Sequence, residues 1–322
     1  MLRPHLAFRR CLCLLMIALV WSPPTAWAEG WRAGVGTVNI TPSQPLWMAG
    51  YASRDRPADG KLTDLWAKAL WLEDRQGSAA VLIALDLIGF DRALSTSLCQ
   101  RLEREYGLQR DQVALCPSHT HSGPVVAQNL RPLHLEQLDA PQQARIHAYA
   151  QRLQENVVQV VGQARASRQP VRLTWGNGQA TFAVNRRANR EAEVPRLRTA
   201  GKLTGPVDHD VPVLAMRTSR EGLLAVVFGY ACHATVLDGY QWCGDYPGYA
   251  QLALEQAHPG SVALFWAGCG ADQNPVPRRQ VALAKQYGQQ LADAVENVLQ
   301  QPMQPIEGDL ASIYREVDLR LD

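Results

Sequence analysis

The sequence predicts an α/β fold in which a mixed β-sheet is flanked by helices and a metal site lies at the C-terminal ends of strands. Two observations support this prediction. Apolar segments of strand length alternate with amphipathic segments of helix length, with no internal repeat, low-complexity tract or long linker between them. Three of the apolar segments also run directly into short polar loops, two of them rich in glycine. Because ligands of open α/β sheets bind at the C-terminal ends of strands, these three loops form the candidate site.

The N-terminus has the pattern of a secretory signal peptide over residues 1–28. Arg9 and Arg10 precede an apolar run at residues 11–20, and an Ala-Trp-Ala sequence that ends at Ala28 is typical of a cleavage site. The run is too short for a stable transmembrane helix, and no later stretch is apolar enough to form one. We therefore expect cleavage near Ala28 and a secreted or periplasmic mature chain without a transmembrane segment.

The composition is that of an ordinary globular enzyme, with 47% hydrophobic and 19% charged residues. The formal net charge of +2 includes three arginines of the signal peptide, so the mature chain is close to neutral. No basic stripe interleaves with aromatic residues, which argues against a nucleic-acid partner. In an oxidising compartment we expect one or two disulfides and a buried thiol from the cysteines that follow the signal peptide. These are Cys99, Cys116, Cys232, Cys243 and Cys269.

The expected elements can be placed in order along the chain. Residues 79–87 form a continuous apolar run, which is typical of a buried strand. Asp91 is placed to cap a helix that ends at Gly107. The next short strand covers residues 112–116, and Asp139 marks the start of a long helix whose apolar residues recur at helical spacing. The later elements are a β-hairpin over residues 211–216 and 223–230, a helix over 249–257, a strand over 262–266 and an amphipathic helix over 281–299.

His119 and His121 form an H-x-H pair in the loop after the strand at residues 112–116. In extended backbone, side chains two residues apart project to the same side, so both imidazoles can face one cavity. His233 follows the strand at residues 223–230 and can join them. Neutral imidazole is a common zinc ligand, and an imidazole beside a metal can also stabilise a developing oxyanion. The pattern therefore indicates a metal-assisted hydrolase, in which zinc would lower the pKa of a bound water to about 7.

Three further residues have both structural and functional interpretations. Asp245 stands just before a predicted helix, where it can simply be an N-terminal carboxylate. Asp272 lies in the third loop, after the strand at residues 262–266, and can be a metal ligand, a partner that orients a histidine, or a turn residue. Arg186 is followed by a second arginine, a pattern typical of a solvated surface. Spacing alone leaves these alternatives open.

An H-x-H pair also opens the metal site of the amidohydrolase barrels. In that fold the pair lies on the first strand of the barrel, and further His, Lys and Asp ligands follow. Here strands and a helix precede the pair, and the hairpin interrupts the βα alternation. The order of elements therefore argues against a barrel enzyme.

Seven short motifs, taken in order, make the chain resemble the neutral/alkaline non-lysosomal ceramidase family. The S-H-T-H-S-G-P loop is the most specific of them, and the agreement covers nearly the whole mature chain. The motifs are A-G-V-G-T-V-N-I-T-P at residues 33–42, A-L-D-L at 84–87, S-H-T-H-S-G-P at 118–124, V-N-R at 184–186, A-C-H-A-T at 231–235, G-D-Y-P-G-Y-A at 244–250 and A-D-Q-N-P at 271–275.

The resemblance implies one zinc ion per chain, with His119 and His233 as ligands. His121 and Arg186 would then stabilise the oxyanion formed when zinc-bound water attacks an amide carbonyl. Members of the family hydrolyse N-acylsphingosine, so the expected substrate is a lipid amide, with peripheral membrane contact. Residues 29–322 would form the N-terminal catalytic domain.

The resemblance also assigns residues around the metal. The glycine-containing segment at Gly34 and Gly36 would line the same cavity, and Asp245 and Asp272 would contact the substrate or support the ligands. Asn274 stands where the family has its catalytic serine, and an asparagine can hydrogen-bond a substrate but cannot be acylated.

Two more features depart from the family pattern. Ala271 replaces a glycine, and the Glu and Tyr that complete the family's zinc site belong to a segment beyond Asp322. Residues 313–322 alternate like a strand. We therefore expect a domain that is incomplete at its C-terminus and a poor catalyst by itself. The alternative is a non-catalytic, metal- or lipid-binding remnant of the family.

Overall fold

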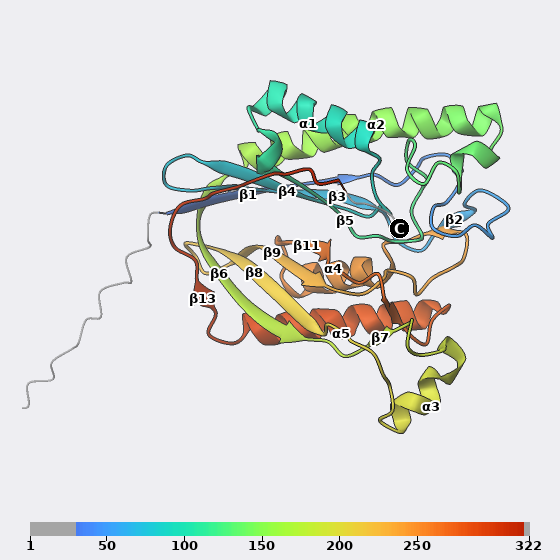
Figure 1. Cartoon of the computed structure of the whole chain (residues 1–322). Helices are drawn as coiled ribbons and strands as arrows, with labels where there is room; N and C mark the ends of the chain where they lie inside the picture. Colours follow the sequence, from blue (N-terminus) through green and yellow to red (C-terminus); the bar gives the residue numbers. More distant parts are fainter. Residues whose placement is uncertain (1–29, 319–322) are drawn as a thin grey trace, which may run out of the picture.

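The computed structural model describes residues 30–318, which fold into two layers of strands between two layers of helices (Figure 1). The strands belong to one nine-stranded sheet in the order β11-β9-β8-β6-β1-β3-β4-β5, with β13 paired to β6. The expected α/β class, with a mixed sheet flanked by helices, is confirmed. The first layer contains β1 (Trp31–Asn39), β3 (Trp66–Glu73), β4 (Ala79–Leu85) and β5 (Val113–Pro117); the second contains β6 (Gln169–Gln179), β8 (Asp210–Thr218), β9 (Leu223–Tyr230) and β11 (Val262–Ala267).

The sheet folds over on itself where β1 meets β6. Only three residues at the start of β1, Trp31 to Ala33, pair with β6. Beyond them β6 leaves β1 and pairs with β8 over Val171 to Gln179. The two strands therefore diverge into separate layers. An apolar core that includes Leu70, Leu173 and Leu264 fills the space between the layers.

Helices cover the outer face of each layer and complete two further cores. Helices α1 (Arg92–Tyr106) and α2 (Ala140–Ala166) lie over the first layer, and α4 (Asp245–Ala257) and α5 (Val281–Leu299) lie over the second. The caps expected from the sequence are present. The Asp91 carboxylate accepts a hydrogen bond from the amide of Leu94, and Gly107 ends α1 in the left-handed conformation with φ 75°. The predicted long helix α2 and the hairpin β8–β9 are likewise confirmed.

Short elements complete the chain between these layers. They are β2 (Gly60–Lys61), η1 (Arg110–Gln112), η2 (Leu135–Gln137), β7 (Ala183–Asn185), η3 (Glu191–Glu193), α3 (Val194–Thr199), β10 (Gln241–Trp242), β12 (Gln273–Pro275) and β13 (Gln304–Pro305). Strand β7 pairs with β12, which brings the segments around Asn185 and Asn274 together.

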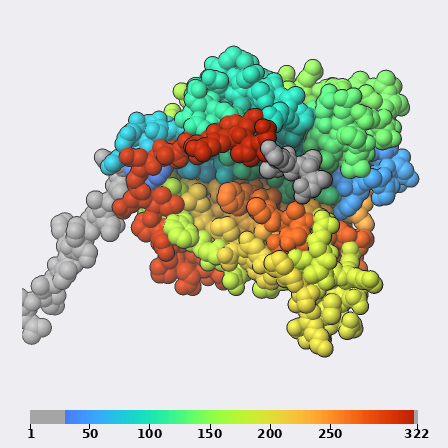
Figure 2. Space-filling model, in the orientation of Figure 1, coloured from blue at the N-terminus to red at the C-terminus, as the bar shows by residue number. Residues whose placement is uncertain are grey.

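The C-terminal tail is not the strand that its alternating pattern predicted. Residues 313–318 form no ladder, and Ile313 and Val317 are 74% and 75% exposed, so no sheet face buries the apolar positions. Side chains hold the tail instead: the Arg110 guanidinium lies 3.9 Å from the centre of the Tyr314 ring, and Glu316 pairs with Arg92 at 2.8 Å. Figure 2 shows the tail as a red band across this face. Residues 319–322 lie outside the described part.

The cysteine expectation is wrong for the described residues. Cys99, Cys116, Cys232, Cys243 and Cys269 are all free thiols there, and three of them are buried. They lie in helix α1, strand β5 and three separate loops. The predicted signal peptide at residues 1–28 lies outside the described residues. Among residues 30–318, no helix is both long enough and apolar enough to cross a membrane.

Candidate metal centre

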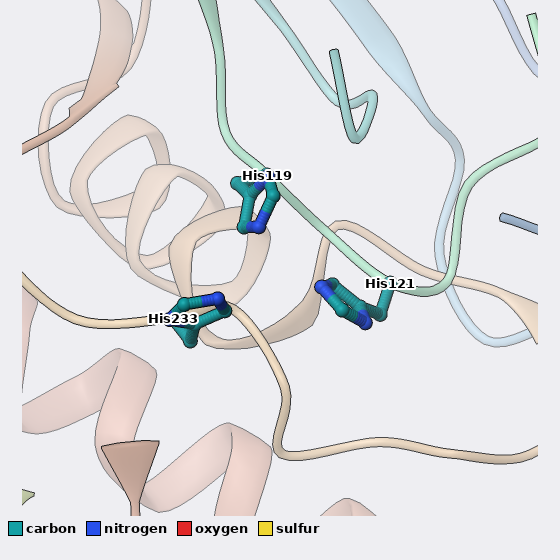
Figure 3. Close-up of side chains that lie close together, drawn as sticks. All are labelled: His119, His121 and His233. Atoms are coloured by element: carbon teal, nitrogen blue, oxygen red, sulfur yellow. The ribbon is translucent and has the colours of Figure 1, made fainter. Parts of the chain in front are cut away.

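Three imidazoles from two loops meet at the edge of the molecule where β5 and β9 end. His119 and His121 follow β5, and His233 follows β9. One ring nitrogen from each of the three lies within 4.8 Å of the others, a group that could hold a metal ion. Figure 3 shows the rings turned toward one another, and the ring centroids of His119 and His233 are 4.9 Å apart. The convergence of strand ends expected from the sequence therefore exists.

Backbone carbonyls orient two of these imidazoles. The Nδ1 atom of His119 lies 2.8 Å from the carbonyl oxygen of Ile88, and the Nδ1 atom of His233 lies 2.8 Å from that of Gly270. Because a carbonyl only accepts, each Nδ1 carries the proton, which leaves the Nε2 lone pair free. This is the arrangement usual for metal-ligating histidines. His119 also has φ 60°, an uncommon conformation for a residue with a Cβ that is concentrated at functional sites.

No hydrogen bond to a backbone carbonyl orients the ring of His121. Both its ring nitrogens are buried, and within the described part of the chain neither has a hydrogen-bond partner. Such an orphaned polar group costs about 1–3 kcal/mol, which a bound metal or ligand would offset. Burial lowers the pKa of His121 to about 3, with contributions from His119 and His233, so the ring is neutral and able to ligate. Gly50 packs on this ring so closely that a Cβ there would lie 2.5 Å from it.

These observations show that the residues present fit a metal ion. All three donors are imidazole nitrogens, two have their tautomer set by a carbonyl, and the third is otherwise unsatisfied. Imidazole nitrogen suits zinc and other late transition metals. Within residues 30–318, no carboxylate belongs to the group.

A cavity of about 430 Å³ opens beside the three imidazoles, between the ends of β5, β9 and β11. The residues that line it are mostly apolar residues and cysteines, together with His119 and His233. Trp266 is 46% exposed there, and its indole packs against Gly229 of β9, where a Cβ would be 1.7 Å from its Nε1. The other lining residues are Leu115, Cys116, Pro117, Cys232, Ala267, Gly268, Cys269, Gly270 and Ala271.

Arg186 lies close enough to His233 to act on it electrostatically. Its Nε donates to the carbonyl of Ala271 at 3.0 Å, and its amide donates to the carbonyl of Asp272 at 2.8 Å. These bonds hold the guanidinium beside the loop that follows β11. Burial lowers the pKa of His233, and the positive charge of Arg186 adds to this effect.

Asp245, Asp272 and Asn274 do not line this cavity, and their side chains accept hydrogen bonds from neighbouring segments. Asp245 is the first residue of α4, not the residue before it, and is fully buried. Its carboxylate accepts hydrogen bonds from the amides of Val236 and Leu237, just after His233, at 3.2 and 2.9 Å. The Asp272 carboxylate accepts from Asn185 Nδ2 at 3.1 Å. The Asn274 side chain, 5% exposed, accepts from the Thr235 hydroxyl at 3.5 Å.

The expectation for Gly34 and Gly36 is wrong. Both lie within strand β1 and face helix α2, not the cavity. A Cβ at position 34 would lie 2.1 Å from the carbonyl oxygen of Ala164, and one at position 36 would lie 2.4 Å from that of Val160. The two glycines therefore allow a helix and a strand to approach closely.

The residues that contact His121, Tyr51 and Arg54, were not predicted from the sequence. The Tyr51 ring lies 4.9 Å from the His121 ring, and Arg54 is 6% exposed and donates to the His121 carbonyl at 2.7 Å. No motif or periodicity marks either residue. An arginine buried by contacts with backbone carbonyls has no signature in a single sequence, because the carbonyls are common to all residues.

The fold and the site together define a four-layer α/β protein with a histidine cluster able to hold a metal. Residues 31–318 match the family model described as neutral/alkaline non-lysosomal ceramidase, N-terminal. The chain belongs to this family.

Several known proteins are similar to the chain. A neutral ceramidase of Pseudomonas aeruginosa is 26% identical over 268 residues, which cover 80% of this chain and 39% of that protein. A neutral ceramidase of Drosophila melanogaster is 30% identical over 97 residues, or 29% of this chain and 14% of that protein. A solved structure of a ceramidase complexed with C2 superposes with a TM-score of 0.73 at 21% identity, covering 87% of this chain and 45% of that chain. The chain thus spans less than half the length of these relatives.

Proposed function

We propose that this chain is an exported, zinc-dependent amide hydrolase of neutral ceramidase type that acts on a lipid amide. Membership of the family supports the reaction class. The signal-peptide pattern at residues 1–28 supports export. The observation that carries the metal dependence is the cluster of His119, His121 and His233, with nitrogens within 4.8 Å of one another.

In this proposal His119 and His233 would hold the zinc ion through Nε2, and His121 would stabilise the negative charge that develops on the amide carbonyl oxygen. Both buried ring nitrogens of His121 lack a partner among the described residues, so the ring is available to hydrogen-bond that oxygen. Zinc at this position would polarise an amide carbonyl and lower the pKa of a water molecule to about 7.

The chain's own residues bind and orient the substrate. The apolar walls of the 430 Å³ cavity, which include Trp266, take one hydrocarbon arm of the lipid amide and so bring the carbonyl to His119 and His233. Arg186, held beside the same loop, stabilises the negative charge that develops on the carbonyl oxygen. Asn274 forms no covalent intermediate, since an amide side chain is not a nucleophile.

Hydrolysis of a fluorescent N-acylsphingosine by purified residues 29–322 tests this function. We expect slow turnover that a chelator abolishes and that added zinc restores. A matched control is His147→Ala, because His147 is an exposed histidine on α2, away from the cluster. Two outcomes would contradict the proposal. One is a folded protein that binds zinc but does not hydrolyse the substrate, and the other is a rate of hydrolysis that the chelator does not change.

The second candidate is a non-catalytic protein that binds metal and lipid. The asparagine at position 274, where the family has a serine, favours it. The same experiment separates the two candidates. A binding protein would retain the fluorescent lipid in the cavity and release no product.

A further inference from the structure

Residues 187–207 form a lobe that projects from the body of the molecule. The lobe follows β7, contains η3 and α3, and ends before β8, which begins at Asp210. Figure 1 shows α3 standing apart from the two layers of strands, and Figure 2 shows the same segment in yellow at the lower right. We call this segment the α3 lobe.

Two buried asparagines close the base of the α3 lobe. The Nδ2 atom of Asn185 donates to the carbonyl of Pro206 at 2.9 Å, and its Oδ1 atom accepts from the amide of Arg187 at 3.0 Å. Asn189 joins the two arms a second time, because its Nδ2 atom donates to the carbonyl of Thr204 at 2.7 Å. Asn185 and Asn189 are 3% and 4% exposed. Their side chains therefore fix how the lobe leaves the fold.

The rest of the lobe is attached to the segment that follows β12. Val194 packs with Val276 in a small apolar core, and the Arg198 guanidinium donates to the carbonyl of Val276 at 2.7 Å. Glu191 pairs with Arg278 at 2.8 Å. These contacts make the lobe a firm part of the surface, so its exposed charges keep fixed places.

The base of the α3 lobe adjoins the metal centre. The His233 amide donates to the carbonyl of Gln273 at 3.0 Å, and Gln273 pairs with Asn185 between β12 and β7. Arg186, the residue before the lobe, acts electrostatically on His233. A surface that binds the lobe is therefore held beside the histidines.

The lobe carries an excess of positive charge, although the mature chain is close to neutral. Residues 187–207 include five Arg and Lys residues and two Glu residues, which gives a net charge of +3. Both carboxylates are already paired, Glu191 with Arg278 and Glu193 with Arg196. Three further cations of the lobe are exposed and belong to no ion pair within residues 30–318; they are Arg187, Arg190 and Lys202.

We infer that the α3 lobe is a docking surface for an anionic lipid bilayer, with Arg187, Arg190 and Lys202 as the contacts to lipid phosphates. Basic side chains near an anionic bilayer each strengthen binding by about fivefold. Residues 187–207 contain no aromatic residue on which a nucleic-acid base could stack. The choice of a bilayer rests on the proposed function, because an enzyme that acts on a lipid amide takes its substrate from a membrane.

The test measures binding of purified residues 29–322 to lipid vesicles by co-sedimentation. The vesicles consist of phosphatidylcholine alone, or of an equimolar mixture of phosphatidylcholine and phosphatidylserine. The lobe variant combines Arg187→Gln, Arg190→Gln and Lys202→Gln. A matched control removes three cations that are also exposed and outside the described ion pairs but lie on other elements; it combines Arg104→Gln, Arg145→Gln and Arg220→Gln.

We expect the parent protein to bind the anionic vesicles and not the neutral ones, and added salt to weaken this binding because it screens exposed charges. The lobe variant should bind the anionic vesicles about 100-fold more weakly, and the control should stay within about threefold of the parent. Melting temperatures should stay close to that of the parent. Each single lobe substitution should cost about fivefold, and it carries the test if the combined variant does not fold.

Hydrolysis separates the inference from the proposed function on which it rests. In detergent micelles, which offer no anionic surface, the lobe variant should hydrolyse N-acylsphingosine as fast as the parent, because its metal centre is unchanged. In anionic vesicles it should be slower. Vesicle binding that depends on the lobe but leads to no hydrolysis in either medium would contradict only the proposed function.

Three results would overturn the inference. One is a parent protein that binds anionic vesicles no better than neutral ones. Another is an equal loss of binding in the lobe variant and the control, which would mean that net charge matters and this surface does not. The third is lobe-dependent binding of single-stranded DNA by a protein that does not bind the anionic vesicles.

Discussion

The imidazoles of His119 and His233 lie with their ring centroids 4.9 Å apart, although β5 and β9 stand near opposite ends of the sheet order. They meet because the sheet folds over between β1 and β6, so that its two halves become facing layers. The histidine cluster is therefore a property of the whole fold. A substitution that loosens one layer from the other should affect the site even when it lies far from the histidines.

Trp266 should govern the use of long hydrocarbon chains. It forms a half-exposed platform beside His119 and His233, so Trp266→Ala should raise KM for long-chain lipid amides by about tenfold and change KM for short-chain ones much less. Steady-state kinetics over a series of acyl lengths measures this. Trp175→Ala is the control, since Trp175 is 43% exposed on β6, outside the cavity. Equal effects of the two variants would argue against a substrate role for this cavity.

Asn274 should not be a nucleophile. Asn274→Ser should leave the rate within about tenfold, or roughly 1.4 kcal/mol of barrier, because the side chain is buried against Thr235 and away from the cavity lining. Kinetics of the variant and mass spectrometry of the parent protein after quenching with substrate provide the measurements. An acyl adduct mapped to residues 271–275 of the parent protein is the contrary outcome.

Asp245 should be required for stability through the loop that follows His233. Asp245→Ala removes the acceptor for the buried amides of Val236 and Leu237, so we expect the free energy of unfolding to fall by about 2–4 kcal/mol in urea titrations. Asp245→Asn keeps one carbonyl acceptor and should lose less. An alanine variant as stable as the parent protein would show that these amides find other partners.

Glu191 should give a pH-dependent contribution to stability. Hydrogen bonds from Arg278 and Arg279 lower the pKa of Glu191 to about 2. A carboxylate with a lowered pKa stabilises the fold above its unfolded pKa of about 4.3, and this contribution is lost as the pH falls toward 2. The side chain is 36% exposed, so solvent screening limits the effect to about 1 kcal/mol.

Unfolding of Glu191→Gln and of the parent protein at several pH values measures this contribution. The two should differ by about 1 kcal/mol at pH 7, and the difference should narrow steadily below pH 4. Glu193→Gln is the control, because Glu193 forms only an exposed pair with Arg196. A difference that stays constant with pH would mean that the charge of Glu191 is not what stabilises the loop.

The local parts of the fold could be predicted from the sequence. Asp91 and Gly107 mark the ends of α1 because capping is a local interaction, and the H-x-H pair indicates a metal site because it places two imidazoles two residues apart. The extended backbone expected for this pair is absent, since His119 has φ 60°. Those signals lie within a few residues of the feature that they predict.

The features of the fold that could not be predicted from the sequence depend on contacts between distant segments. The fold-over at β1 and β6 follows from a pairing of three residues with a strand far along the chain. Gly34 and Gly36 have the composition of a binding loop, but the contact that requires them is with α2. Alternation at residues 313–318 has the period of a strand, yet a strand also needs a partner edge, which the described tail does not have.

Zinc content tests the central claim most directly. Purified residues 29–322 should contain about one zinc ion per chain, by elemental analysis, and so should His147→Ala. His119→Ala and His233→Ala should each lose most of that metal, because each removes an imidazole whose tautomer a backbone carbonyl has set. Zinc content that is unchanged in both variants would contradict the claim that these loops form a metal centre.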